Sequence, residues 1–180
     1  MREQLIHSIP PVWDAQSRIL ILGSFPSPKS REQGFFYGHP RNRFWQVLSA
    51  VYAYPVPQTV EEKINFLHHA HIALWDVLAS CSIEGAADSS VRDPRPNDLS
   101  PILQGAPITA ICTTGKTAHR LYTRFIAPDT GIDAISLPST SPANAGMSLD
   151  ALVEAYRLLL RGRLKKIGKM ISLSGTILTF

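Results

Sequence analysis

Cysteine is scarce in this chain of 180 residues, and its scarcity excludes two kinds of fold. Cys81 and Cys112 are its two cysteines, which are too few for a disulfide framework or a four-cysteine metal cluster. Both lie in apolar stretches of sequence, so we expect them to be small core residues.

Long apolar runs are absent as well. No segment approaches the roughly 20 apolar residues that a membrane-spanning helix needs. The first residues, MREQLIHSIPPVWD, lack the apolar run of a signal peptide, so the cytoplasm is the expected compartment.

Several familiar motifs are also missing. Residues 23–30, GSFPSPKS, approach the phosphate loop G-x-x-x-x-G-K-S, but Pro28 replaces its second glycine and has no N–H to offer a phosphate. No G-x-G-x-x-G follows the first predicted strand, which argues against a dinucleotide fold. The absence of a G-x-S-x-G elbow argues against an α/β-hydrolase.

Positive charge is concentrated rather than general. The formal net charge is +4, yet five basic residues lie in the last twenty positions, and without them the chain is nearly neutral. A global basic field is therefore weak evidence for nucleic-acid binding. A local cluster is better evidence. In residues 18–43 the one acidic residue is Glu32, and the basic residues are Arg18, Lys29, Arg31, Arg41 and Arg43.

Apolar strands alternate with helices along most of the chain. Strands are predicted at 18–22, 71–77, 108–112 and 134–137. Helices are predicted from 40–42 onward, over 61–70 and 116–125, and after a Ser148 cap, with 80–101 mostly loop. This order predicts an α/β fold, a three-layer α/β/α sandwich with a central four-stranded, mostly parallel sheet.

The domain organisation follows from the same pattern. We expect one domain over residues 1–160 and a basic, then apolar, tail over residues 161–180. The last ten residues, 171–180, leave three interpretations open: an edge strand, a disordered tail, or sequence beyond the working domain.

Polar segments follow the predicted strands and should meet at one rim of the sheet, where such folds bind ligands. Asp76 and residues 113–115 end two of these strands. The other two strands lead into longer loops, which carry Gly23, Ser24, Phe25, Pro26, Phe35, Phe36, Tyr37, His39 and Asn42, and Ser139, Thr140, Ser141, Pro142 and Asn144. Aromatic faces beside small hydrogen-bonding groups suit a flat heterocycle, and Arg41 and Arg43 could hold phosphates.

These residues resemble those of the uracil-DNA glycosylase superfamily. Residues 23–27, GSFPS, stand at the first motif, and 137–145, LPSTSPANA, stand at the second. Residues 38–45, GHPRNRFW, are similar to the H-P-x-N-R-F-W segment of the mismatch-specific branch. With LWDV at 74–77, the pattern over residues 15–160 is most similar to the hypoxanthine (deoxyinosine) DNA glycosylase family.

One departure from the superfamily concerns catalysis. Phe25 stands where the mismatch-specific branch has its catalytic asparagine, G-I-N-P-G, and a phenyl ring cannot orient water. The resemblance to the hypoxanthine family implies that Asn42 takes this role and positions water through its amide oxygen. The alternative is that Asn42 only caps the following helix.

The resemblance implies a DNA repair enzyme that hydrolyses the N-glycosidic bond of a deaminated base, hypoxanthine being favoured, and leaves an abasic site. Gly23, Ser24, Phe25, Phe36 and Tyr37 would hold the flipped base. DNA contacts would come from His39, Arg41, Arg43, Ser139, Thr140, Ser141, Pro142 and Asn144. No metal or organic cofactor is expected, and the protein should act as a monomer. Alternatives are a glycosylase for uracil or mismatched thymine, a nucleic-acid-binding module without chemistry, and a small-nucleoside hydrolase.

Overall fold

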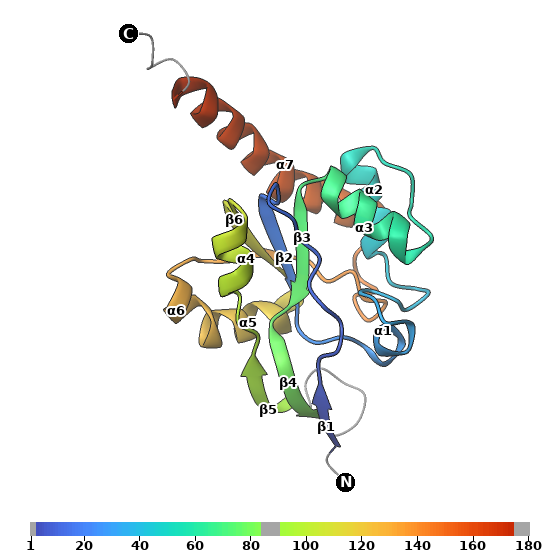
Figure 1. The fold of residues 1–180 in the computed structure, drawn as a ribbon. Helices are drawn as coiled ribbons and strands as arrows, with labels where there is room; N and C mark the ends of the chain where they lie inside the picture. Colours follow the sequence, from blue (N-terminus) through green and yellow to red (C-terminus); the bar gives the residue numbers. More distant parts are fainter. Residues whose placement is uncertain (1–2, 84–90, 175–180) are drawn as a thin grey trace.

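The computed structural model describes residues 3–83 and 91–174, with side chains described as far as Arg161 (Figure 1). Its strands are β1 (Glu3–Ile6), β2 (Ile19–Gly23), β3 (Ile72–Asp76), β4 (Leu78–Ile83), β5 (Val91–Pro96), β6 (Ala110–Thr114) and β7 (Ile135–Leu137). Its helices are α1 (Pro28–Gln33), α2 (Phe44–Tyr52), α3 (Val60–His69), α4 (Ser100–Gly105), α5 (Gly115–Phe125), α6 (Ala127–Thr130) and α7 (Leu149–Ser174).

The central sheet has four parallel strands in the order β3-β2-β6-β7. β2 lies between β3 and β6, and all five of its residues are buried. Such continuous burial is expected of a parallel strand covered on both faces, and it explains the unbroken apolar run of its sequence. The predicted three-layer α/β fold is confirmed.

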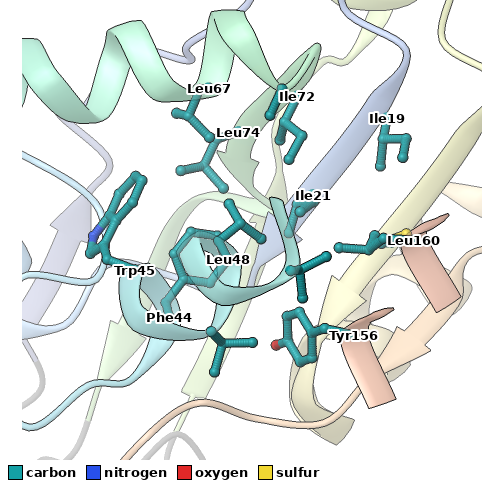
Figure 2. Close-up of a cluster of buried hydrophobic side chains, with 14 of the residues drawn as sticks. Ile19, Ile21, Phe44, Trp45, Leu48, Leu67, Ile72, Leu74, Tyr156 and Leu160 are labelled. Atoms are coloured by element: carbon teal, nitrogen blue, oxygen red, sulfur yellow. The ribbon is translucent and has the colours of Figure 1, made fainter. Parts of the chain in front are cut away.

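Helices cover the two faces of this sheet, and alternate residues of each strand enter different cores. Ile19 and Ile21 of β2 pack with α2, α3 and α7, as Figure 2 shows around Phe44, Leu48 and Tyr156. Leu20 and Leu22 pack against α4 and α5 on the other face. The sheet therefore forms the middle layer.

The prediction of loop over residues 80–101 is wrong. β4 and β5 occupy much of this segment, and α4 begins at Ser100. β4 pairs with both β1 and β5 in a second, antiparallel sheet. Pro94 and Pro96 suggested a loop, but proline is tolerated in an edge strand, and β5 lies at the edge. β1 was not predicted either, because its exposed residues show little apolar patterning.

Other local predictions have mixed outcomes. Cys81 and Cys112 are buried, as expected. The loop after β2 contains a short helix, α1, that was not predicted. Ser148 does cap α7, with its hydroxyl accepting from the backbone N–H of Ala151 at 3.1 Å.

The final helix extends beyond residue 160, where the domain was predicted to end. α7 runs without a break to Ser174, so residues 171–174 are helical, and residues 175–180 lie outside the described part. In Figure 1 its distal half extends away from the sheet. The division into residues 1–160 and 161–180 stays a prediction. Within the described part, no helix has the length and apolar character that crossing a membrane requires.

The docking of α7 on the sheet can be tested with two leucines of that helix. Leu152 is fully buried, whereas Leu158 is 67% exposed. Leu152→Ala should lower the free energy of unfolding by about 2–5 kcal/mol, because it removes apolar contact and leaves a cavity. Leu158→Ala should change it by less than about 0.5 kcal/mol. Urea denaturation measures both, and equal effects would contradict the packing described here.

Candidate active site

A cavity of about 670 Å³ opens at the rim where the parallel strands end. Its size is within the usual range for small-ligand sites. Residues of the loop after β2, the ends of β3 and β6, and the loop after β7 line it, as predicted from the strand order. Glu3, Leu5, Ile83 and Val91 add a wall from the second sheet, which the sequence had not indicated.

The chain after β2 is held in place by α1. Ser27 caps this helix, with its hydroxyl accepting from Ser30 N–H at 3.2 Å. The Ser30 hydroxyl in turn accepts from Gly38 N–H at 3.0 Å. These bonds tie Gly38 to α1, and Ser24, Phe25 and Tyr37 on either side of α1 line the cavity.

Gly23 is required by close packing at the end of β2. A Cβ atom there would overlap Oδ1 of Asp76 and come within 3.3 Å of the Tyr37 hydroxyl. The absence of a side chain lets the β3 carboxylate and the tyrosine approach the same point. Gly23 thus shapes the cavity through its backbone, consistent with its predicted place in the base-binding loop.

The predicted aromatic residues lie in the cavity wall, and they differ in exposure and in the contacts that hold them. Phe25 is 9% exposed and Phe36 is 2% exposed. One face of Tyr37 stacks on Phe44, with ring centroids 3.8 Å apart, and its hydroxyl is 2.8 Å from Thr114 Oγ1. Burial, and then the charge of Asp76, raises the pKa of Tyr37, so its hydroxyl stays neutral.

Asn42 lines the cavity, and its amide oxygen accepts two hydrogen bonds. One comes from Phe44 N–H at the start of α2, and the other comes from the Thr140 hydroxyl; both are 2.9 Å long. The side chain therefore does support the helix start, which was one of its two predicted roles. Because both donors go to Oδ1, the Nδ2 group is the part of the amide left to contact a ligand.

The second predicted loop meets the first at the cavity. Ser139, Thr140 and Ser141 line it, whereas Pro142 and Asn144 do not. The Asn144 side chain instead donates to Ser139 O at 2.9 Å and stabilises the loop from within. Three of the five predicted residues are thus brought to the cavity.

The predicted phosphate-binding residues lie outside the cavity wall. Arg41 is exposed, and the His39 ring accepts from its backbone N–H at 3.1 Å. The Arg43 guanidinium donates to the carbonyl oxygens of Asn144, at 2.9 Å, and Met147. Arg43 therefore ties the two loops together, and its contact with DNA stays a prediction.

Arg31 is a basic residue that the sequence indicated only as part of a cluster. It lines the cavity, and its guanidinium lies over the Phe25 ring, 6.0 Å from the centroid. Its Nη1 atom is buried and has no hydrogen-bond partner in the part of the chain that the structure describes. This places an available donor beside the predicted base-binding aromatics.

Asp76, which lines the cavity, forms a buried polar pair with His7. His7 Nε2 and Asp76 Oδ2 are 2.8 Å apart, and the two side chains are 2% and 6% exposed. Burial raises the pKa of the Asp76 carboxyl, while the hydrogen bond from His7 opposes this effect. Sequence reasoning placed Asp76 at a strand end but gave it no role. It missed His7 altogether, because β1 was not predicted.

Among the described residues, no group of three or more His, Cys, Asp or Glu side chains is arranged to hold a metal ion. The polar atoms in the cavity are instead hydroxyl, amide, carboxylate and guanidinium groups. Together with the aromatic walls, they suit an uncharged, planar molecule with a hydrogen-bonding edge.

Comparison with known proteins agrees with this geometry. Residues 10–160 match the family model described as "Uracil DNA glycosylase superfamily". A hypoxanthine DNA glycosylase of Methanosarcina acetivorans is 36% identical over 141 residues, which cover 77% of this chain and 88% of the relative. One of Methanosarcina barkeri is 34% identical over 99 residues, covering 54% of this chain and 63% of the relative.

A solved structure is similar as well. It is a solution NMR structure of a protein from Methanosarcina acetivorans described as a candidate uracil DNA glycosylase. The TM-score is 0.71 at 33% identity, with 85% of this chain and 97% of the other covered. The predicted family is thereby confirmed: the chain belongs to the uracil DNA glycosylase superfamily and is a DNA glycosylase.

Proposed function

We propose that this DNA glycosylase removes hypoxanthine from DNA, leaving an abasic site, with water positioned by Asn42. The observation that carries this proposal is the cavity itself. It joins aromatic walls, hydrogen-bonding groups and Asn42 at the rim where both motif loops meet. The two relatives named hypoxanthine DNA glycosylase support the choice of base.

The reaction begins with extrusion of the damaged nucleotide, which costs about a few kcal/mol and is easiest for a mispaired base. Phe25 presents its ring to the cavity, and backbone groups near Ser24 can hydrogen-bond the base. The exposed Arg41 and the second loop would contact the DNA backbone. As the glycosidic bond breaks, the sugar gains oxocarbenium character, and the departing base gains negative charge.

Asn42 is preorganised for water positioning by the two hydrogen bonds at its oxygen. Because that oxygen is engaged, we propose that Nδ2–H holds the water oxygen, in place of the expected contact through Oδ1. An asparagine amide is a poor base, so its contribution is orientation of the water toward the sugar. Among the described residues, no lysine lines the cavity, which supports a monofunctional reaction. We further propose that the protein acts as a monomer.

A second candidate substrate is uracil, since the similar NMR structure is described as a candidate uracil DNA glycosylase. Both bases have a ring N–H beside a carbonyl group. The cavity of about 670 Å³ is roomy enough for either one. The choice between them depends on an assay.

Oligonucleotides carrying inosine, uracil, xanthine or a T/G mismatch separate these functions. We expect alkali-labile abasic sites with inosine, formed without strand cleavage before the alkali treatment. Excision of uracil but not of hypoxanthine from inosine would show that uracil, rather than hypoxanthine, is the substrate base. Tight DNA binding without excision of any base would instead favour a binding module.

The role of Asn42 can be separated from its support of α2. Asn42→Ala should lower the excision rate by at least about 100-fold, because the water loses its orientation. It should also lower the free energy of unfolding by about 0.5–2 kcal/mol, as the loss of a helix cap does.

Thr59→Ala is the matched control for this variant. Thr59 caps α3 in a capping box exposed to solvent, and it lies outside the cavity wall. Its removal should cost similar stability and leave excision unchanged. Single-turnover kinetics and urea denaturation measure both quantities. Full activity in Asn42→Ala would exclude Asn42 from the mechanism.

A further inference from the structure

Arg31 is a basic residue of the cavity wall whose guanidinium has a buried donor without an acceptor. It stands on α1, and its Nη1 atom has no hydrogen-bond partner in the part of the chain that the structure describes. Glu32, the acidic residue beside it, is instead paired with Lys29 at 2.7 Å. A buried donor without a partner costs free energy, so its presence beside a cavity indicates that a ligand supplies the acceptor.

The guanidinium lies close to the aromatic side chain that is expected to stack on the base. It is over the Phe25 ring, 6.0 Å from the centroid. Since no described residue forms a hydrogen bond with Nη1, the group can turn toward a ligand without breaking one. A flipped nucleotide inserts its base into the pocket and leaves its phosphates at the protein surface. Phe25 is 9% exposed, so the position of Arg31 beside it favours contact with the base.

The charged groups of the cavity wall differ in sign. Glu3 and Asp76 are acidic, and Arg31 is the one basic residue among the described residues that line the cavity. Tyr37 is neutral, because burial raises its pKa. An ionised carboxylate repels a base that leaves with negative charge, and a positive charge nearby offsets this repulsion. Arg31 is the side chain of the wall that can supply the positive charge.

The shape of the guanidinium matches one edge of hypoxanthine. N7 and O6 lie side by side on that edge, and both are hydrogen-bond acceptors, as they are in guanine. Arginine pairs with these two atoms of guanine in the commonest specific contact between proteins and DNA bases. The guanidinium is a planar fork that stays charged in proteins. It can therefore donate two hydrogen bonds to a departing base and keep its own protons.

We propose that Arg31 donates hydrogen bonds to N7 and O6 of the flipped hypoxanthine and stabilises the negative charge that the base acquires as it leaves. The inference rests on the proposed function and adds a catalytic residue to it. The bond from C1′ of the sugar to N9 breaks, and its electron pair stays with the base. Water supplies the hydroxyl group that C1′ gains, and its remaining proton neutralises the base. Arg31 itself transfers no proton.

Single-turnover excision of hypoxanthine tests the catalytic part of this proposal. Arg31→Met keeps an unbranched apolar side chain beside Phe25 and removes the charge and the donors. It should lower the excision rate by about 100- to 1000-fold, which is the usual effect of removing one donor to a developing negative charge. Arg31→Lys keeps the charge without the fork and should recover part of the rate. A rate in Arg31→Met equal to that of the wild type would overturn the proposal.

Arg124→Met is the matched control. Arg124 also lies over a phenyl ring, 5.0 Å from the centroid of Phe125, but it is exposed on α5 and lies outside the cavity wall. Its substitution should leave excision unchanged. Arg31→Met should keep the urea midpoint of the wild type, because Nη1 has no hydrogen bond to lose. A lower midpoint, with an equal loss of rate in Arg31→Lys, would indicate a structural role and overturn the proposal.

Binding measures the contact itself and needs no excision. The DNA carries a 2′-fluorinated nucleotide, which resists hydrolysis, with either hypoxanthine or 7-deazahypoxanthine, in which a C–H group replaces N7. The wild type should bind the hypoxanthine DNA about 10-fold more tightly than the 7-deaza DNA, which is the effect of one hydrogen bond from a charged donor. Arg31→Met should bring this ratio close to one, and Arg124→Met should preserve it.

A contact between Arg31 and a DNA phosphate would give a different result. Arg31→Met would then weaken binding to hypoxanthine, 7-deazahypoxanthine and undamaged DNA equally, and the slope of log affinity against log salt would become shallower by about one. That outcome would overturn the proposal. An unchanged binding ratio in Arg31→Met would overturn it as well.

The two measurements also separate this inference from the proposed function. If the wild type excises no hypoxanthine, the proposed function fails, while the binding ratio still tests Arg31. If it excises hypoxanthine and neither the rate nor the ratio depends on Arg31, the inference alone fails.

Discussion

The complete burial of β2 between β3 and β6 is the constraint on which the rest of the structure depends. Because the three strands are parallel and adjacent, their carboxyl ends reach the same rim, and residues far apart in sequence become neighbours. Helices must cover both faces, since every side chain of β2 is apolar or absent. Gly23 ends this strand without a side chain, and the space it leaves lets Asp76 and Tyr37 approach one another.

Hydrogen bonds join the two loops that leave the rim of the sheet. The Asn42 oxygen receives donors from the start of α2 and from Thr140, and Arg43 donates to the carbonyl oxygens of the second loop. Arg43 N–H also donates to Thr140 O at 3.1 Å. Polar groups in these loops are thus satisfied by one another. The same bonds that stabilise the loops fix the walls of the cavity, so structural and functional roles fall on the same residues.

The sequence predicted the parts of the molecule whose signals are local. The apolar strands, the helix caps and the two motif loops each occupy one short segment, and the parallel order follows from their alternation. The second sheet could not be predicted, because its proline-bearing edge strand and exposed first strand lack a period of two. Motif membership does not show where a side chain points, and five of the predicted DNA contacts do not line the cavity: His39, Arg41, Arg43, Pro142 and Asn144.

The His7–Asp76 pair shows why such sites are hard to infer from sequence. A buried carboxylate is costly, since desolvation opposes its ionisation and raises its pKa, and the contact with His7 opposes this effect. Apolar residues would pack at the end of β3 with less penalty. The pair joins residues 69 positions apart through a strand with no apolar signal. Asp76 lines a cavity of about 670 Å³, so a buried carboxylate at this position is best explained by what enters the cavity.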